Sequence, residues 1–203
     1  MDIVLWTLIA FLSGSIPFSV LVGRLAANVD IRKYGDHNPG ATNVLRATGW
    51  GWGALAGLLD YLKGAVPVGI PWFLLGIHGW GIVPIALAPL LGHAYSPWLR
   101  FRGGKAVATT FGVWTGLTLG AGPVMLGVLL SLAFAVFVVS GWAVVLAMLG
   151  FGGFVWLQYS SHQPELMVIW LGNLILLAWK YREELGQPPG IRPWLMRLIG
   201  RGS

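Results

Sequence analysis

The sequence contains no cysteine, and charged residues make up only 10% of its 203 positions. Without cysteine, the chain has neither disulfides nor thiolate metal ligands. From residue 106 to residue 164 there is no Lys, Arg, Asp or Glu at all. The seven carboxylates are scattered along the chain and form no ligand cluster, so the sequence indicates no metal site. It indicates no cofactor either.

Apolar residues are correspondingly abundant, at 56% of the chain, and they include 12 Trp. A soluble domain of this composition would expose large apolar patches to water. The predicted fold class is therefore all-α, a polytopic integral membrane helix bundle. Its length suits a single transmembrane domain over residues 1–203.

Apolar stretches of about 20 residues, the length that crosses a bilayer, predict seven transmembrane helices. The uncharged middle has room for three of them, with breaks expected at residues 119–123 and 139–141. The other four are expected over residues 4–25, 51–75, 80–98 and 166–179. We expect the first of these to be one helix, because Gly14 and Pro17 are tolerated within membrane helices.

The basic residues predict the orientation of this bundle. Twelve of the 13 fall in connections at one end, and the positive-inside rule places that end in the cytoplasm. An odd number of spans then puts the N-terminus outside and the C-terminus in the cytoplasm. Residues 190–203 are expected to form an interfacial amphipathic tail, with Arg197 and Arg201 on one face and Leu195 and Leu198 on another.

The formal net charge of +6 admits nucleic acid, anionic lipid or an anionic substrate as a partner. Nucleic acid is not expected, because the chain has no soluble basic domain to bind it. For most of the basic residues, topology and contact with membrane lipid head groups are a sufficient interpretation.

Two polar, glycine-rich segments at the basic end resist that interpretation. They are DIRKYGDHNPGATNVLRATG, residues 30–49, and LGHAYSPWLRFRGGKAVATT, residues 91–110. Glycines allow successive N–H groups to converge on an anion, and basic side chains add permanent positive charge. A tight turn at the membrane surface is the structural alternative. The residues expected to bind phosphate are Asn38, Gly40, Thr42, Asn43, Arg46, Gly103, Gly104 and Lys105.

These segments, together with GSIPFSVLVGRL and LLDYLKG, are similar in order and spacing to the bacterial acyl-phosphate:glycerol-3-phosphate acyltransferase family, the PlsY type. The resemblance implies an enzyme of phospholipid biosynthesis in the bacterial cytoplasmic (inner) membrane, with its active face in the cytoplasm. Such an enzyme transfers a fatty acyl group from acyl phosphate to the 1-hydroxyl of glycerol 3-phosphate and makes lysophosphatidic acid. The resemblance also adds His93 to the binding residues, and it includes Asp60 and Lys63, which we expect to brace the second span.

The chain departs from the family pattern in two places. Family members usually have Ser-Gly where this chain has Asp36 and His37, and a carboxylate beside a phosphate site would repel the ligand unless turned away or protonated. The third family motif, after the last span, usually supplies a His and an Asn, whereas this chain has Tyr181 and Glu184. Either the substrate has changed or the activity has been lost.

The sequence offers no catalytic nucleophile. Acyl phosphate is already activated, so positioning and charge neutralisation could supply much of the rate. The catalytic candidates are Lys105, Arg46 and, as a general base peculiar to this chain, His37. A surface histidine in a turn is the alternative for His37.

Two other functional classes stay open. The losses in the third motif favour a non-catalytic relative that serves as a structural or assembly subunit, with protein partners in a larger membrane complex. A transporter or channel would need polar residues through the depth of the bundle, and only Asp60 and Lys63 are candidates.

Overall fold

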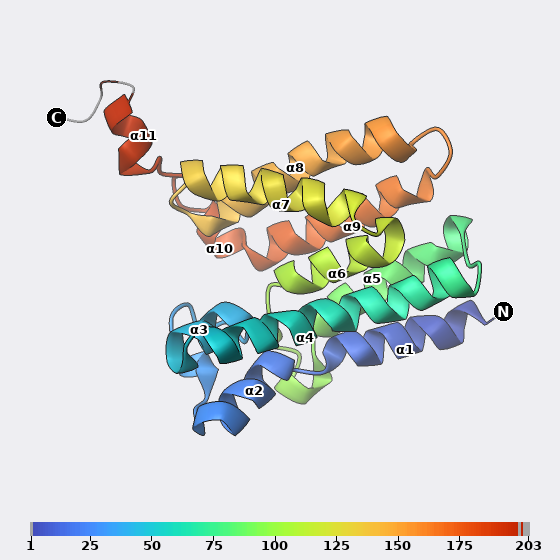
Figure 1. Ribbon diagram of the computed structural model, residues 1–203, viewed down its shortest axis with the longest axis horizontal. Helices are drawn as coiled ribbons and strands as arrows, with labels where there is room; N and C mark the ends of the chain where they lie inside the picture. The colour runs from blue at the N-terminus through green and yellow to red at the C-terminus, as the bar shows by residue number, and fades with distance from the viewer. Residues whose placement is uncertain (1, 199, 201–203) are drawn as a thin grey trace. The chain divides into compact units, whose positions relative to one another are not determined.

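The computed structural model describes residues 2–198 and 200, and those residues fold as helices and connections (Figure 1). They form two compact units, which divide between Gly122 and Pro123. The elements that begin in the first unit are α1 (Ile3–Ser15), α2 (Phe18–Ala27), η1 (Ile31–Lys33), α3 (Ala41–Thr48), α4 (Trp50–Gly69), η2 (Ile70–Leu74), η3 (Gly79–Gly81), α5 (Ile82–Ala94), η4 (Pro97–Leu99), α6 (Val107–Thr118) and α7 (Ala121–Val136). Those of the second unit are α8 (Ser140–Tyr159), α9 (Glu165–Lys180), α10 (Arg182–Leu185) and α11 (Pro193–Leu198).

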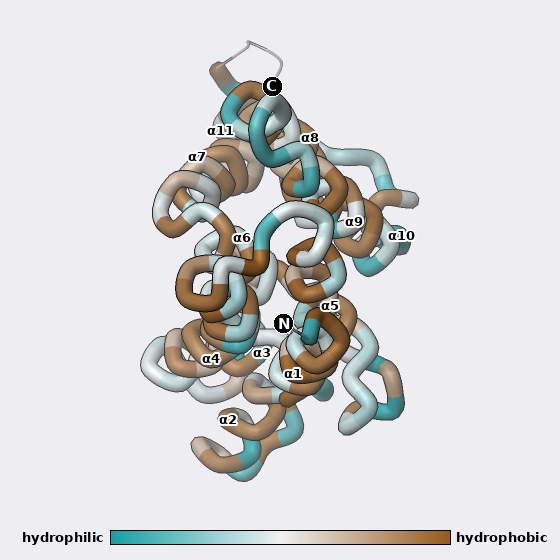
Figure 2. Tube along the Cα trace, turned by 90° about the vertical axis from the view of Figure 1, so that its right-hand side faces the viewer, coloured by the Kyte–Doolittle hydropathy of each residue, from teal (hydrophilic) through white to brown (hydrophobic). Residues whose placement is uncertain are grey.

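Helices occupy all seven positions that the hydropathy predicts, and they are mainly brown in Figure 2, with the hydrophilic stretches mostly in connections and at α10. Among the described residues, four stretches are long and apolar enough to cross a membrane: residues 3–27, 50–74, 79–99 and 140–159. Helices α6, α7 and α9 have 12, 16 and 16 residues, shorter than the roughly 20 that a span usually needs. The count of seven crossings therefore stays a prediction.

The breaks within the uncharged middle are confirmed. Helix α6 ends at Thr118 and α7 begins at Ala121, while α7 ends at Val136 and α8 begins at Ser140. The expected tail contains the short helix α11, but residue 199 and residues 201–203 lie outside the described residues. The interfacial tail and the single transmembrane domain both stay predictions.

The expectation of one continuous first helix is wrong. Helix α1 ends at Ser15, Ile16 and Pro17 are extended or irregular, and α2 begins at Phe18. Proline has no N–H to donate and its ring clashes with the preceding turn, so backbone carbonyls near it lose their helical partners. Two of these carbonyls find side chains instead. Lys63 Nζ donates to the Ile16 carbonyl at 2.8 Å, and Ser96 Oγ donates to the Ser15 carbonyl at 2.6 Å.

Small residues bring the helices of the first unit into close contact. Helix α1 packs along α5, and α4 packs along α6. A side chain at Gly92 would collide with the backbone of Phe11 in α1, and one at Gly112 would collide with the backbone of Tyr61 in α4. Membrane helices associate through such small residues because lipid gives them no hydrophobic driving force of their own.

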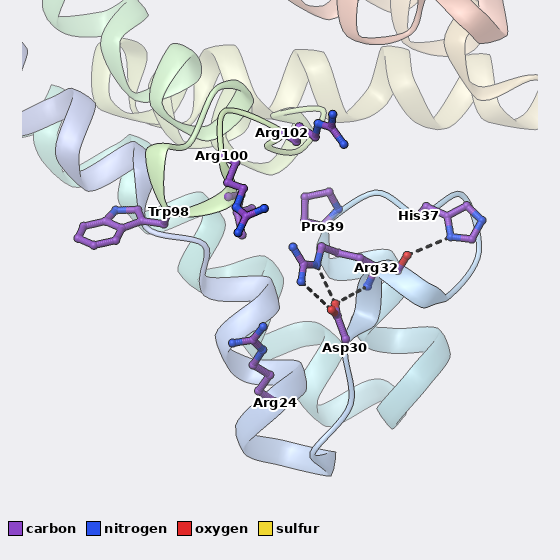
Figure 3. A pocket seen from close by; sticks show the side chains of 9 residues that line it. Arg24, Asp30, Arg32, His37, Pro39, Trp98, Arg100 and Arg102 are labelled. Carbon is purple, nitrogen blue, oxygen red and sulfur yellow. Dashed lines mark hydrogen bonds and ion pairs between the residues drawn. The ribbon is translucent and has the colours of Figure 1, made fainter.

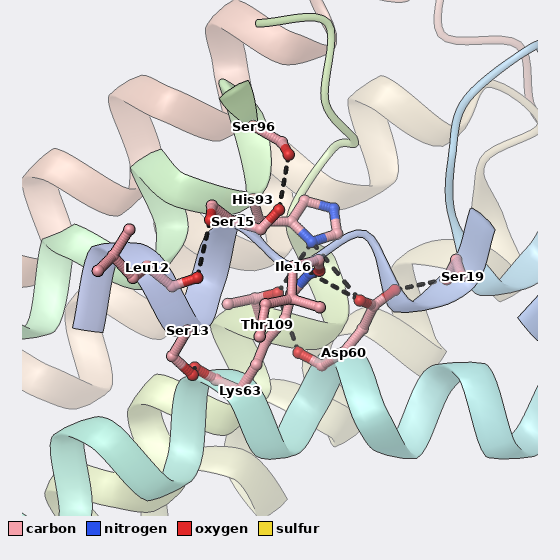
Figure 4. Close-up of polar contacts among 10 residues, drawn as sticks. All are labelled: Leu12, Ser13, Ser15, Ile16, Ser19, Asp60, Lys63, His93, Ser96 and Thr109. Atoms are coloured by element: carbon pink, nitrogen blue, oxygen red, sulfur yellow. Dashed lines mark hydrogen bonds and ion pairs between the residues drawn. The ribbon is translucent and has the colours of Figure 1, made fainter. Parts of the chain in front are cut away.

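A buried polar cluster joins the same helices (Figure 4). Asp60 and Lys63, on one face of α4, form an ion pair with 2.8 Å between Nζ and Oδ1. Ser19 of α2 donates to Asp60 Oδ2 at 2.5 Å, and Thr109 of α6 donates to the Asp60 carbonyl at 3.0 Å. The Asp60 and Lys63 side chains are 3% and 2% exposed. The expected bracing role of this pair follows from these contacts.

Removing one partner of this pair should cost far more stability than removing both. Asp60→Ala leaves a buried ammonium uncompensated, a loss of about 3 to 5 kcal/mol that lowers the Tm by roughly 10 °C. The double variant Asp60→Leu with Lys63→Met removes both charges and should melt above the single variant. Thermal unfolding of the purified protein in detergent measures both. Equal Tm values for the two variants would contradict the pairing argument.

Candidate active site

The first motif folds into a turn whose centre is Asn43. Gly35 has φ +56° and lies directly against the side chains of Asn43 and Arg46, so any larger residue there would collide with both. Gly40 caps the start of α3, whose first turn then carries Asn43, of which only 1% is exposed. Asn43 Nδ2 donates to the Asn38 carbonyl at 2.9 Å, and its Oδ1 accepts from Arg46 Nη1 at 3.0 Å.

The two motifs meet at Asp36. Lys105 Nζ, from the second motif, donates to Asp36 Oδ2 at 2.7 Å. Asn43 Nδ2 donates to Asp36 Oδ1 at 2.9 Å. The Asn38 N–H donates to the same oxygen at 3.3 Å. We call this group of Asp36, Asn38, Asn43, Arg46 and Lys105 the anion cradle. The structure brings these residues of the two motifs together, with an internal carboxylate among them, and their binding role stays a prediction.

The carboxylate of Asp36 is neither turned away from the cations nor protonated. Partial burial raises the pKa of Asp36, but Lys105, through its hydrogen bond and charge, together with Asn43 and the Asn38 N–H, lowers it to a net value below the usual range. A lowered pKa means that the ion pair is complete at neutral pH and is lost only as the pH falls through that value. The cradle thus holds an anion of its own.

Two other predicted residues of the first motif lie outside these contacts. Thr42 precedes Asn43 on α3 with an exposed side chain, which makes no hydrogen bond within residues 2–198 and 200. His37 has φ +60°, and its Nδ1 is 3.0 Å from the Arg32 carbonyl, so Nδ1 carries the proton in that contact. Nε2 is left to act as a base, but the ring contacts none of the cradle residues in the described part of the chain. A catalytic role for His37 stays a prediction.

In the second motif, the glycines have a different role from the one predicted. The Gly103 N–H donates to the Ala94 carbonyl at 3.2 Å and the Gly104 N–H to the His93 carbonyl at 3.1 Å, so both are already used within the protein. A side chain at either position would collide with His93 or its neighbour. Close packing, not free N–H groups, is what these positions require.

His93 itself lies on the Asp60 cluster. Its side chain is 7% exposed, and Nδ1 lies 3.3 Å from Thr109 Oγ1 and 3.9 Å from Asp60 Oδ1. Because Gly104 packs on the other ring nitrogen, His93 fixes the start of the segment that carries Lys105. This position favours an orienting role for His93 over contact with substrate.

The third motif has a structural role in the second unit. Glu184 Oε2 accepts from the Gly141 N–H at 2.8 Å, which caps the beginning of α8 with a negative charge. Tyr181 is 7% exposed, at the end of α9. Replacement of these two residues by the family's His and Asn would therefore remove a helix cap as well as change chemistry.

Within residues 2–198 and 200, no three His, Cys, Asp or Glu side chains are grouped closely enough to hold a metal ion. What the cradle offers chemically is the binding of an anion by Lys105, Arg46 and neutral amides.

Neutralising Asp36 should strengthen phosphate binding. Asp36→Asn removes the internal anion while keeping a side chain of similar size, so Lys105 becomes available to an external one. A partly exposed ion pair is worth up to about 1 kcal/mol, so the Kd for inorganic phosphate and for glycerol 3-phosphate should fall by up to about fivefold. Isothermal titration calorimetry measures this, with Glu183→Gln as a matched loss of one exposed carboxylate. Unchanged or weaker binding in Asp36→Asn would show that the carboxylate does not compete.

Comparison with known proteins agrees with the geometry. A family model described as glycerol-3-phosphate acyltransferase matches residues 4–187. Glycerol-3-phosphate acyltransferase 1 of Thermotoga maritima is 36% identical over 190 residues, covering 87% of this chain and 93% of the relative. A glycerol-3-phosphate acyltransferase of Thermus thermophilus is 40% identical over 192 residues, covering 91% of each chain.

Among solved structures, the crystal structure of PlsY (YgiH), an integral membrane glycerol 3-phosphate acyltransferase, in its glycerol 3-phosphate form aligns with a TM-score of 0.82 at 28% identity. The alignment covers 99% of this chain and 94% of that one. The lysophosphatidic acid form of PlsY aligns with a TM-score of 0.80 at the same identity. The predicted all-α integral membrane bundle has the PlsY fold, and the chain belongs to the glycerol-3-phosphate acyltransferase family.

Proposed function

We propose that this chain transfers a fatty acyl group from acyl phosphate to the 1-hydroxyl of glycerol 3-phosphate and releases lysophosphatidic acid and inorganic phosphate. Family membership supports the reaction class, since the chain matches glycerol-3-phosphate acyltransferases over most of its length. The PlsY relative is known in a glycerol 3-phosphate form and a lysophosphatidic acid form, the acceptor and the product of this reaction.

The observation that carries the proposal is the anion cradle. Lys105, Asn43 and the Asn38 N–H all contact one carboxylate, that of Asp36. Arg46 lies beside them through its contact with Asn43. A phosphate group accepts hydrogen bonds as a carboxylate does and carries more negative charge, so it can exchange with Asp36 for the same donors.

The chemistry needs no protein nucleophile. The 1-hydroxyl oxygen of glycerol 3-phosphate attacks the acyl carbon, the bond from that carbon to the phosphate oxygen breaks, and inorganic phosphate leaves with the electron pair. The hydroxyl proton passes to a phosphate oxygen of the substrate. Lys105 and Arg46 stabilise the negative charge that collects on the phosphate groups, and the rest of the rate comes from positioning.

A second candidate function is a non-catalytic subunit of a larger membrane complex. The specific observation in its favour is that Glu184 caps α8, so the third motif is used for structure. The two candidates differ in one measurable property, which is turnover.

The donor experiment tests the proposal directly. Purified protein in detergent receives glycerol 3-phosphate with acyl phosphate, acyl-CoA or acyl carrier protein, and lysophosphatidic acid is quantified by mass spectrometry. Turnover is expected with acyl phosphate alone, since this mixed anhydride is already activated whereas a thioester is a poorer donor. Lys105→Ala should lower kcat/KM at least about tenfold, as expected for loss of a charged hydrogen bond to phosphate.

Two further variants sharpen that experiment. Lys33→Ala removes an exposed lysine from the connection that carries Asp36 and should have little effect. Lys105→Ala combined with Asp36→Asn should recover part of the lost activity, because the unpaired carboxylate of the single variant no longer repels phosphate. Turnover with acyl-CoA but not acyl phosphate would contradict the donor. No turnover with any donor, and unchanged phosphate binding in Lys105→Ala, would favour the non-catalytic subunit.

We also propose seven crossings, with the anion cradle and the C-terminus on the cytoplasmic side of the bacterial inner membrane and the N-terminus outside. The absence of native cysteine allows a clean test. Single cysteines at Tyr34, Arg102 and Gln187 should resist a membrane-impermeant thiol reagent applied to intact cells, whereas one at Gly79 should react. Labelling of any of the three at the level of Gly79 would overturn this layout.

A further inference from the structure

A basic pocket lies in the first unit, lined by residues of α2, of the first motif and of the segment after α5. Its volume is about 830 Å³. Figure 3 shows the guanidinium groups of Arg24, Arg32 and Arg100 facing a common space, with Arg102 farther off. We call this the arginine pocket. Its lining residues are Arg24, Asp30, Arg32, His37, Pro39, Trp98, Leu99, Arg100 and Arg102.

The charge of the arginine pocket is mostly uncompensated. Asp30 holds Arg32 through two hydrogen bonds, Nε to Oδ1 at 2.8 Å and Nη2 to Oδ2 at 2.6 Å. The Arg32 hydrogen bond outweighs burial and holds the pKa of Asp30 at about 2, so this pair stays charged at any physiological pH. The pocket lining contains four arginines and one aspartate, so its net charge is +3 when His37 is neutral.

Those three charges belong to Arg24, Arg100 and Arg102. Within the described part of the chain, none of the three side chains forms a hydrogen bond or an ion pair. Arg100 is also held in an uncommon conformation, with φ +53° followed by +61° at Phe101. Non-glycine residues in this region cost of order 1 kcal/mol or more each and gather at functional sites. The fold thus accepts backbone strain at an arginine that faces the pocket.

An apolar pocket of about 340 Å³ adjoins the arginine pocket. The two share Arg24, Arg32, Trp98 and Leu99. Trp98 is 69% exposed, and its Nε1 donates to Ser15 Oγ at 3.1 Å, which fixes the indole at the junction. The other residues that line the apolar pocket are Ile16, Pro17, Val20 and Leu21. Both volumes fall in the range of roughly 300 to 1,000 Å³ typical of ligand sites.

We propose that the two pockets form one site for a phosphate-headed lipid, with the phosphate among Arg24, Arg32 and Arg100 and an acyl chain along the apolar pocket. Arginine matches this chemistry because its planar group binds phosphate oxygens in pairs. Topology alone explains basic residues at a membrane surface, but it does not require them to converge beside an apolar pocket. The site shares no residue with the anion cradle, so it stands whether or not the chain is an active acyltransferase.

Native mass spectrometry of the full chain in a neutral detergent tests the site, with phosphatidic acid and phosphatidylcholine of the same acyl chains as probes. The Kd for phosphatidic acid should be at least about tenfold lower. Arg24→Gln and Arg100→Gln should each raise that Kd by about fivefold, while Lys33→Gln, a matched loss of charge on the neighbouring segment, should change it less than about twofold. Lys105→Ala should leave it unchanged, which separates this site from the anion cradle.

The acyl chain is tested separately. Leu21 lines the apolar pocket, whereas Leu25, one turn further along α2, is 86% exposed and does not line it. Leu21→Gln should weaken binding of phosphatidic acid and Leu25→Gln should not, and this pair decides the matter even if an arginine variant fails to fold. Equal binding of the two lipids, or equal losses in Lys33→Gln and Arg24→Gln, would overturn the site. Displacement by inorganic phosphate as efficiently as by phosphatidic acid would overturn the lipid and leave a phosphate ion as the ligand.

Discussion

The first unit depends on one buried ion pair, Asp60 with Lys63. Pro17 interrupts the first apolar helix and frees backbone carbonyls, and a carbonyl inside a membrane helix bundle needs a partner within the protein. Lys63 supplies one by donating to the Ile16 carbonyl, and Asp60 balances the charge that this requires. Ser19 and Thr109 then attach α2 and α6 to the same carboxylate residue. A polar cluster that is costly to bury in an apolar bundle therefore supplies the partners that a break in the helix needs.

The same cluster positions the candidate active site. His93 lies between Asp60 and Gly104, and Gly104 immediately precedes Lys105. The break at Pro17 redirects α2 away from the line of α1, and the connection after α2 carries the first motif. The polar core and the anion cradle are thus structurally connected. The Asp60–Lys63 ion pair holds the helices together, and the helices position Lys105 beside Asp36.

Hydropathy predicted the positions of the membrane helices and the breaks in the uncharged middle, because apolar length alone decides them. It missed the break at Pro17, since proline is tolerated in many membrane helices and only the partners on α4 and after α5 show that this one ends the helix. The meeting of the two motifs was also predictable from their composition. Their detailed roles were not, because the N–H groups of Gly103 and Gly104 are taken by carbonyls that lie close only in the fold. Glu184 could not be recognised as a cap for the same reason.

The ion pairs of the first unit distinguish cations with a structural role from cations at the candidate binding sites. Three of the four aspartates in residues 2–122 each hold one cation: Asp30 holds Arg32, Asp36 holds Lys105 and Asp60 holds Lys63. The buried pair is permanent, since separating it would leave a charge in an apolar core. The Asp36–Lys105 pair is partly exposed, so a competing anion can take the place of the Asp36 carboxylate at little cost in free energy. Arg24, Arg100 and Arg102 form no ion pair within residues 2–198 and 200, although the charge of Arg24 also lowers the pKa of Asp30 after the larger effect of Arg32. The proposed lipid phosphate would balance them. Burial thus separates the pair that supports the fold, Asp60 with Lys63, from the more exposed cations that a phosphate can reach.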